Sequence, residues 1–357
     1  MGDFTERVKR KNKYNLSKLP LTISAKYGLV DQITFFNKIV ASTDMSNYYL
    51  LKKGEFAYNK SYSNDYPWGA IKRLDNYEQG VLSALYICFT TQDNVESDFI
   101  LQYFESPKWH KSVSEIAVEG ARNHGLLNIS VQDFFQTYHY VPKEKKEQTK
   151  IATLLHLIDE RISTQNKIIE KLESLIKGIR NDVFGKLRKS VGFNAMIGDV
   201  LSYEQPQSYL VEDTEYTNEG TPVLTANKAF VLGYTSEIEG IYDKGDCIIF
   251  DDFTLDCKYV DFSFKVKSSA IKILTAKNKE LLRYTFEFLK YLDLSTEEHK
   301  RHYITETQNQ EFILPTVQIV RTIAHAFYAL SLWKETIVKQ RYAFEKQKQY
   351  LLRQMFI

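Results

Sequence analysis

The sequence predicts an α+β fold in which two similar domains are separated by two long antiparallel helices that form a coiled coil. Two observations lead to this prediction. An apolar seam runs from Gln148 to Phe184, and its landmarks recur at a constant offset near the C-terminus, where Ile151 returns as Ile323 and Phe184 as Phe356. Two copies of a repeat with this offset account for nearly all of the 357 residues, which indicates a tandem duplication with a pseudo-twofold axis.

The first long helix is predicted from its heptad spacing, because apolar residues recur in alternating steps of four and three. The predicted seam positions are Ile151, Leu155, Ile158, Ile162, Gln165, Ile169, Leu172, Ile176 and Ile179. Only Gln165 among them is polar, and the intervening positions are mainly polar or charged. Such a pattern over several heptads predicts a coiled coil, and a helix with one apolar seam needs a partner in water.

The second copy supplies that partner. Its seam positions, at the same offset, are Ile323, Leu330, Ile337, Phe344 and Leu351. Antiparallel pairing predicts a rod of roughly 55 Å, since an α-helix rises about 1.5 Å per residue. Gln165 corresponds to Ile337 in the repeat, so the two helices differ there. Gln165 either fixes the register of the pair or is a tolerated polar position near the middle of the rod.

The two domains are predicted at 1–141 and 189–313, and the helical segments at 142–188 and 314–357. Short alternating segments bounded by turn residues predict strands in both domains, each set followed by a helix. The recurring strand motifs are Pro20-Leu21-Thr22 with Pro222-Val223-Leu224-Thr225, Lys53-Gly54-Glu55-Phe56-Ala57 with Lys244-Gly245-Asp246-Cys247-Ile248, and Ser83-Ala84-Leu85-Tyr86-Ile87 with Ser269-Ala270-Ile271-Lys272-Ile273. Their offsets differ from that of the helices, as expected if loops changed length after the duplication.

Composition limits the class of protein. The chain is 43% hydrophobic and 26% charged, which is typical of globular domains, and its net charge of +2 excludes a polybasic nucleic-acid coat. Three cysteines without CxxC spacing predict neither a disulfide framework nor a zinc site. We find no apolar run of about 18 residues and no apolar core in the charged N-terminus, so we expect a cytoplasmic protein without a membrane span.

No enzyme motif predicts a catalytic residue or a metal site in this chain. The stretch 178–187 has the wrong glycine spacing for a phosphate-binding loop and lies in a predicted helix. Asp251 and Asp252 lack the Glu-x-Lys of a nuclease, so we expect them to be structural or to contact a partner. His299 and His302 lie beside Lys300 and Arg301, which favours a basic contact loop over metal ligation.

Candidate DNA contacts lie in corresponding loops of the two domains. Basic and amide side chains read base edges, while tyrosine and serine contact phosphates. The candidates in the first domain are Asn59, Lys60, Ser61, Tyr62, Arg122, Asn123 and His124. Those in the second domain are Lys228, Thr254, Lys258, Lys300, Arg301, His302 and Tyr303. Each residue alone is equally compatible with a solvated loop, and the matched positions favour binding.

A motif at the start of the first helix carries a family resemblance. Pro142 is followed by Glu147-Gln148-x-Lys150-Ile151-Ala152, then by Leu155, Asp159 and Ile162, and Gly120-x-Arg122 and Ile197-Gly198-Asp199-Val200 lie outside the helix. With these motifs the chain resembles the specificity (DNA-recognition) subunits of type I restriction-modification enzymes over essentially its whole length. The second helix departs from the pattern, because nothing near Ile319 to Arg321 answers Glu147-Gln148.

The resemblance implies a protein without catalysis of its own. Two target-recognition domains would each read one half of a split sequence in double-stranded DNA, with half-sites a helical turn of about 34–36 Å or more apart. In the family, the spacer helices dock two copies of an adenine methyltransferase subunit that uses S-adenosylmethionine. Restriction/translocase subunits that use ATP and Mg join that core. These cofactors are therefore expected in the partner subunits, with base flipping in the methyltransferase.

Two other functions remain as alternatives. The chain could be a coiled-coil adaptor without DNA readout, which predicts no salt-dependent DNA affinity. It could instead be a methyltransferase with unrecognised motifs, which predicts methyl transfer by the chain alone. The absence of a glycine-rich cofactor loop argues against the second alternative.

Overall fold

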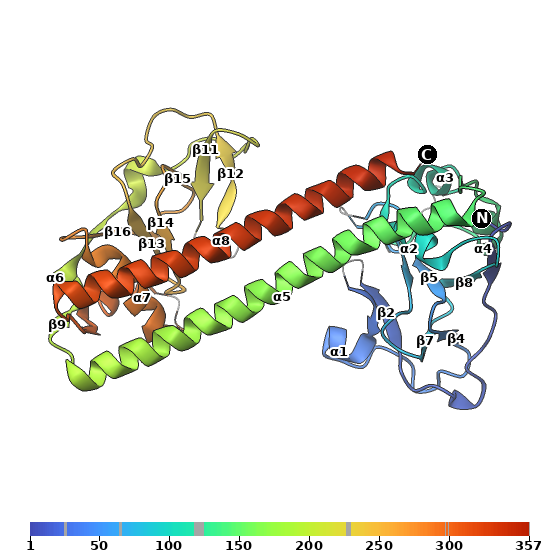
Figure 1. The fold of residues 1–357 in the computed structure, drawn as a ribbon, viewed down its shortest axis with the longest axis horizontal. Helices are drawn as coiled ribbons and strands as arrows, with labels where there is room; N and C mark the ends of the chain where they lie inside the picture. Colours follow the sequence, from blue (N-terminus) through green and yellow to red (C-terminus); the bar gives the residue numbers. More distant parts are fainter. Residues whose placement is uncertain are drawn as a thin grey trace. The chain divides into compact units, whose positions relative to one another are not determined.

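The computed structural model describes residues 1–24, 27–63, 66–117, 125–225, 230–296, 298 and 300–356. These form two compact units: unit 1 comprises Met1–Gln165 and Gln340–Ile357, and unit 2 comprises Asn166–Lys339. Two long helices, α5 (Lys145–Ser190) and α8 (Val317–Gln354), each contribute to both units (Figure 1). The structure confirms the predicted mixed α+β fold with two long helices. The predicted domain boundaries stay a prediction, since the units follow spatial contacts.

Unit 1 is built on a four-stranded antiparallel sheet with the order β1-β8-β5-β6. Its strands are β1 (Thr5–Arg7), β5 (Phe56–Asn59), β6 (Ala70–Arg73) and β8 (Ile87–Thr91). Two hairpins pair β2 (Leu21–Ser24) with β3 (Gly28–Asp31), and β4 (Tyr49–Lys52) with β7 (Gln79–Leu82). The short helices are η1 (Lys13–Asn15), α1 (Gln32–Phe36), α2 (Ser97–Glu105), α3 (His110–Ser114) and α4 (Val131–Gln136).

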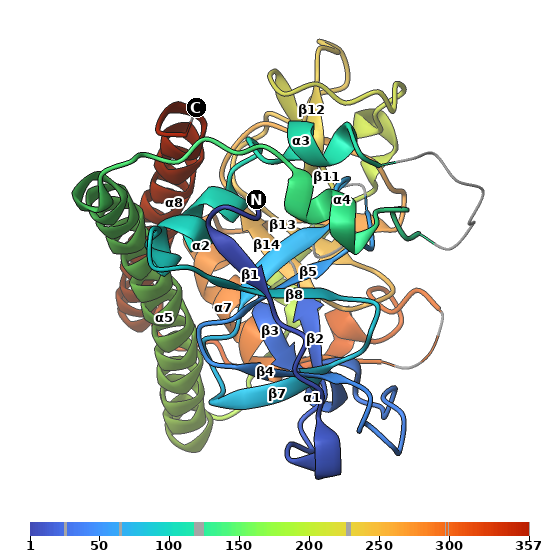
Figure 2. The same cartoon turned by 90° about the vertical axis from the view of Figure 1, so that its right-hand side faces the viewer.

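The two faces of the unit 1 sheet have different partners. Phe56, Tyr58 and Phe89 pack with α2 and with apolar residues of both long helices, and Figure 2 shows α2 between the sheet and α5. Ala57 and Cys88 face the other way, toward the hairpins. Alternate residues of a strand point to opposite faces, so one sheet serves two cores.

Unit 2 repeats this sheet. Its order, β10-β16-β13-β14, is again wholly antiparallel. The strands of this sheet and of a second sheet are β10 (Leu201–Glu204), β13 (Cys247–Asp251), β14 (Cys257–Val260), β16 (Ile271–Ala276), β11 (Thr221–Leu224), β12 (Val231–Thr235) and β15 (Lys265–Val266). The remaining elements are β9 (Ala195–Met196), α6 (Ile197–Val200), η2 (Pro206–Tyr209), α7 (Leu281–Leu292), η3 (Thr307–Asn309) and β17 (Glu311–Phe312).

The matching strand orders explain the recurring Lys-Gly motif. Gly54 and Gly245 precede β5 and β13, and both have a positive φ, of 86° and 95°. This left-handed conformation is easily adopted only by glycine, so both copies need it at the turn into the equivalent strand. The hairpins β2–β3 and β11–β12 are also equivalent. Pro20, which directly precedes β2, pairs in parallel with a further strand, and β11 does the same.

One sequence correspondence was wrong by a residue. The motif match pairs Ile248 with Ala57, but Ile248 lies in the core with the long helices, as Phe56 does. Ile273 likewise pairs with Ile249, whereas Ile87 pairs with Tyr58 on the other face. Side chains alternate between faces, so a slip of one residue exchanges the two cores, and a local motif match does not reveal the slip.

The long helices pair in opposite directions. In unit 1, Lys348 of α8 lies 2.6 Å from Asp159 of α5, and in unit 2 Lys334 lies 2.6 Å from Glu173. The residue number thus falls on α8 as it rises on α5, which is antiparallel pairing. Every predicted seam position is buried or half-buried. Gln165 is half-buried, and its buried Oε1 accepts no hydrogen bond from the described residues.

Candidate DNA interface

In each unit, the loop after one central strand is tied to the segment that precedes a short helix. In unit 1 the loop follows β5, where the carbonyl of Lys60 accepts from the N–H of Leu127 at 2.9 Å and Tyr62 N–H donates to Gly125 at 3.0 Å. In unit 2 the loop follows β13, where the carbonyl of Asp252 accepts from the N–H of His302 at 3.1 Å. The structure therefore ties the loop after β5 to residues 125–127 in unit 1, and it joins the two candidate segments in unit 2.

The unit 1 loop has inward-held and exposed residues. Asn59 Oδ1 accepts the N–H of Ser61 at 3.0 Å, and Lys60 Nζ donates to the carbonyl of Ile129 at 3.2 Å. Burial lowers the pKa of Lys60 from its ordinary value. Ser61 and Tyr62 are exposed, Tyr62 by 53%. Asn59 and Lys60 hold the loop, and the next two side chains are available to a partner.

The return of this loop depends on Gly69. Its φ is +76°, and a Cβ on it would clash with the carbonyl oxygen of Asn59. Only glycine lets the returning chain approach the end of β5 this closely. Arg122, Asn123 and His124 precede Gly125 in the sequence, but they lie outside the described residues, as do Lys228 and His299 in unit 2.

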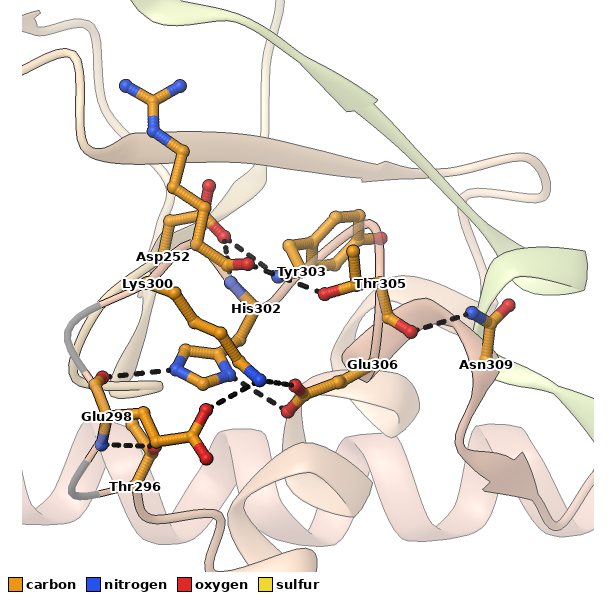
Figure 3. Close-up of polar contacts among 10 residues, drawn as sticks. Asp252, Thr296, Glu298, Lys300, His302, Tyr303, Thr305, Glu306 and Asn309 are labelled. Carbon is orange, nitrogen blue, oxygen red and sulfur yellow. Dashed lines mark hydrogen bonds and ion pairs between the residues drawn. The ribbon is translucent and has the colours of Figure 1, made fainter.

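The unit 2 loop is fixed by buried carboxylates (Figure 3). Asp252 is 1% exposed, and its Oδ1 accepts the N–H groups of His302 at 3.0 Å and Tyr303 at 2.8 Å. Its Oδ2 lies 3.2 Å from Nζ of Lys272, which is also 1% exposed and donates to Gln205 Oε1. Asp251 Oδ1 accepts the N–H groups of the next turn, at Phe253 and Thr254. Both aspartates are thus engaged in holding the backbone.

The predicted contact run at 300–303 divides into an outer and an inner half. Lys300 and Arg301 are exposed, and Lys300 Nζ lies 2.6 Å from Glu298 and 2.9 Å from Glu306 (Figure 3). His302 and Tyr303 are 1% exposed. Direct contact of these two side chains with DNA does not fit this burial, so we correct their role to a structural one. A polar run in sequence does not show which residues turn inward.

The inner half is held by specific contacts. His302 Nδ1 lies 2.8 Å from Glu306, and this hydrogen bond raises the pKa of the histidine. The ring of Tyr303 packs edge-on against Phe250 and Tyr203, with centroid distances of 5.3 Å and 5.5 Å. These contacts fix the backbone at His302 and Tyr303, and the exposed Lys300 and Arg301 directly precede this fixed position.

The two other candidates of unit 2 lie near the same turn. Thr254 is exposed. Lys258 is half-buried and lies 3.0 Å from Asp256, which also lies 2.8 Å from Lys290 of α7. Lys258 therefore belongs to a group of two lysines and one aspartate.

Gln148 has a role that sequence reasoning did not assign. It is 1% exposed, its Oε1 accepts the N–H of Glu96 at 2.7 Å, and its Nε2 donates to the carbonyl of Pro142 at 2.7 Å. The glutamine of the family-like motif thus joins the start of α5 to the start of α2. The corresponding position in the repeat is Val320, also 1% exposed, which packs in an apolar core instead. Where the second helix lacks the Glu-Gln motif, an apolar contact thus takes the place of this polar junction.

Within the part of the chain that the structure describes, no helix combines the length and the apolar character that crossing a membrane requires. Nor do three or more His, Cys, Asp or Glu side chains in this part gather into a group that could hold a metal ion.

The proteins that this chain resembles are specificity subunits of type I restriction-modification systems. No family model matches the chain. A segment of 126 residues is 45% identical to the Escherichia coli type I restriction enzyme EcoR124I/EcoR124II specificity subunit. That match covers 33% of this chain and only 31% of the relative.

Solved structures extend the likeness to the whole chain at the level of the fold. The S subunit of a type I restriction-modification system from M. genitalium has a TM-score of 0.62 at 15% identity, covering 100% of this chain and 94% of the other. A structure that addresses complex assembly and conformational transition of the type I R-M system has a TM-score of 0.53 at 14% identity, covering 99% and 95%. The resemblance seen in the sequence is confirmed, and the chain has the fold of a type I restriction-modification specificity subunit.

Proposed function

We propose that this chain is the DNA sequence-specificity subunit of a type I restriction-modification complex and that it recognises a bipartite target. The observation that carries the proposal is the repetition of one interface. Two units with the same strand order each present a loop after the equivalent strand, β5 or β13, and tie it to a second loop. A split target with two half-sites calls for two such recognition units, and the relative that shares 45% identity over part of the chain is itself a specificity subunit.

Each unit would combine phosphate contacts with base contacts. Lys300 and Arg301 are exposed cations suited to phosphates, which fix the register of a protein on the duplex. Ser61, Tyr62 and Thr254 are exposed at equivalent turns and are the described side chains placed to meet base edges or the sugar-phosphate backbone. Sequence preference would therefore be modular, with each unit reading its own half-site.

The chemistry would reside in partner subunits. We propose that the chain itself is non-catalytic and binds no cofactor. Two adenine methyltransferase subunits would supply S-adenosylmethionine chemistry, and restriction/translocase subunits would use ATP and Mg. The paired helices offer a surface for this assembly, which would act on DNA in the cytoplasm.

Adenine-methylation mapping tests the proposal. The chain is expressed with its cognate methyltransferase subunit in cells that lack other adenine methylation, and the DNA is sequenced for modified adenines. We expect a split motif that disappears when this chain is deleted. A stable complex that leaves no motif would support the adaptor function instead, and methylation by the chain alone would support an enzyme.

Modularity can be tested with one exposed residue. Tyr62→Ala removes a side chain that is 53% exposed in the unit 1 loop. We expect weaker discrimination at one half-site, by about 1–3 kcal/mol, and an unchanged preference at the other. Competition binding with single-base variants of the mapped target measures both, and an equal loss at the two half-sites would contradict modular reading.

A further inference from the structure

A hollow in unit 1 is rich in hydrogen-bond donors. It has a volume of about 310 Å³ and lies between strand β6, the end of α2, the start of α3 and the last turns of α8. Lys72, His110, Gln349 and Arg353 line it, and each offers N–H groups. Among the described residues that line it, Glu105 is the one carboxylate. A concave site with many donors and few acceptors is suited to an anion.

The charges in the hollow do not cancel. Lys72 Nζ lies 2.5 Å from Glu105, with side chains 11% and 31% exposed, so this pair is neutral overall. Burial lowers the pKa of His110, which favours its neutral form. Arg353 remains as an exposed cation, and within the described residues no hydrogen bond or ion pair engages its side chain. The hollow thus carries about one net positive charge, which matches one phosphodiester.

The rim of the hollow belongs to the candidate DNA interface. Tyr66 and Gly69 line it, and both belong to the connection from β5 to β6 that follows Asn59 and carries Ser61 and Tyr62. Gln349 and Arg353 are four residues apart on α8, so their side chains lie on the same face of the helix. A duplex that contacts the loop would run within reach of these donors.

Unit 2 carries a related group at the equivalent place. Lys72 pairs with Ala57 across the sheet, as Lys258 pairs with Ile249, and both lie on an edge strand. Lys258 and Lys290 share Asp256, so this group also has one cation in excess. A lysine on the same edge strand in both copies is a second observation in favour of a ligand with negative charge.

We propose that the hollow holds a backbone phosphate of duplex DNA, with Arg353 as its main charged contact and Lys72, His110 and Gln349 as further donors. The inference rests on the proposed function and deepens it, because it assigns a phosphate contact to the last turns of α8. The same chemistry would suit free inorganic phosphate, and the experiment separates the two sources.

The test is the salt dependence of DNA binding by the full chain. A duplex of mixed sequence suffices, because phosphate contacts are independent of sequence. Arg353→Gln is compared with Arg161→Gln, an exposed arginine on α5 of the same unit that lies outside the hollow. Circular dichroism checks that both variants keep the helices. Affinity is measured from about 0.05 M to about 0.3 M salt.

We expect the slope of log affinity against log salt to become shallower by about 0.9 for Arg353→Gln and to stay unchanged for Arg161→Gln. If the two proteins bind equally at 1 M salt, the variant that has lost one phosphate contact should bind about eightfold more weakly than the wild type at 0.1 M salt. Glu105→Gln removes the neutralising carboxylate, so it should strengthen binding and steepen the slope.

Three outcomes would overturn the proposal. If Arg353→Gln keeps the slope of the wild type, Arg353 does not contact a phosphate, and the proposed function is unaffected. Binding of inorganic phosphate that is lost in Arg353→Gln, with an unchanged DNA slope, would assign the hollow to a free anion. Absence of salt-dependent DNA binding in the wild-type chain would overturn the proposed function together with this inference.

Discussion

Equivalent positions in the two units attach the long helices by the same apolar geometry and by different polar contacts. Phe356 packs against Phe99 and Tyr103 of α2 in unit 1, with centroid distances of 5.4 Å and 5.5 Å. Phe184 packs against Tyr284 and Phe288 of α7 in unit 2, both at 5.4 Å. The aromatic anchor has therefore been retained in both copies of the duplication.

The polar contacts beside these anchors diverge. In unit 1, Gln102 donates to Asp159 at 2.9 Å, and Lys348 neutralises the aspartate. Glu287 precedes Phe288 in unit 2 as Gln102 precedes Tyr103 in unit 1. It lies 2.7 Å from Arg180 and 3.4 Å from Arg283, and it is 2% exposed. Apolar packing constrains shape, whereas a buried polar group needs only some partner, so polar contacts are free to change in pairs.

The largest difference between the units should appear when a buried anion of unit 2 is removed. Asp252→Ala leaves Lys272 as an unpaired charge that is 1% exposed, and it frees the backbone N–H of Tyr303, while the N–H of His302 keeps the backbone carbonyl of residue 252. We expect a loss of about 3–5 kcal/mol from the free energy of unfolding, measured by denaturant titration. The equivalent position of unit 1 is Lys60, which is half-buried, so Lys60→Ala should cost about 1 kcal/mol. Equal losses would contradict the asymmetry.

The junction of α7 with α5 gives the next effect. Glu287→Ala leaves two arginines unpaired, each with a side chain only 14% exposed, and should cost about 3 kcal/mol. Gln102→Ala in unit 1 leaves Asp159 with its lysine and should cost about 1 kcal/mol. Hydrogen exchange of α7 and α2 locates each loss. Glu287→Gln is the control, because it gives unit 2 the amide of unit 1.

The start of each long helix offers a smaller test. Gln148→Ala removes partners from the N–H of Glu96 and the carbonyl of Pro142, so we expect a loss of about 1–3 kcal/mol in unit 1. In unit 2, the N–H of Leu281 already donates to the carbonyl of Asn278. A glutamine at position 320 would therefore lack the free backbone N–H that Gln148 accepts from in unit 1. Val320→Gln should therefore destabilise unit 2 by burying an unsatisfied amide. A stabilising Val320→Gln would show that the motif is interchangeable.

Acid should act on the two units with opposite signs. Burial lowers the pKa of His139 in unit 1 to about 3, so its neutral form stabilises the fold fully above about pH 6.5 and less as the pH falls. At pH 5.5 the loss is about 1.4 kcal/mol. In unit 2, the hydrogen bond to Glu306 raises the pKa of His302. The charged histidine therefore stabilises the fold at low pH, and this stabilisation is lost as the pH rises through the raised pKa.

Hydrogen exchange at pH 7 and pH 5.5, corrected for intrinsic rates, measures this contrast. Helix α2, whose Tyr103 hydroxyl lies 2.8 Å from His139 Nδ1, should lose protection in acid while α7 does not. His139→Gln should remove the acid sensitivity of α2, and a sensitivity that persists in this variant would show that another group titrates.

Sequence patterns predict apolar structure here better than polar structure. The seam from Ile151 to Leu351 could be read directly, because heptad spacing expresses burial at each position. The burial of His302 depends on Asp252, 50 residues earlier in the chain, and no local pattern contains that contact. The one-residue slip at Ile248 has the same origin, since only the cross-strand register decides which face a residue takes.

The composition of unit 1 from two distant segments has a consequence for synthesis. Its core includes Ile151 and Leu155, but also Leu352 and Phe356, which the ribosome adds about 200 residues later. Unit 2 is continuous in sequence, so it can finish folding while unit 1 still lacks part of its core. Nascent chains would expose the apolar face of α5 until translation reaches α8. Completion of the unit 1 core therefore requires that all of unit 2 has already been synthesised.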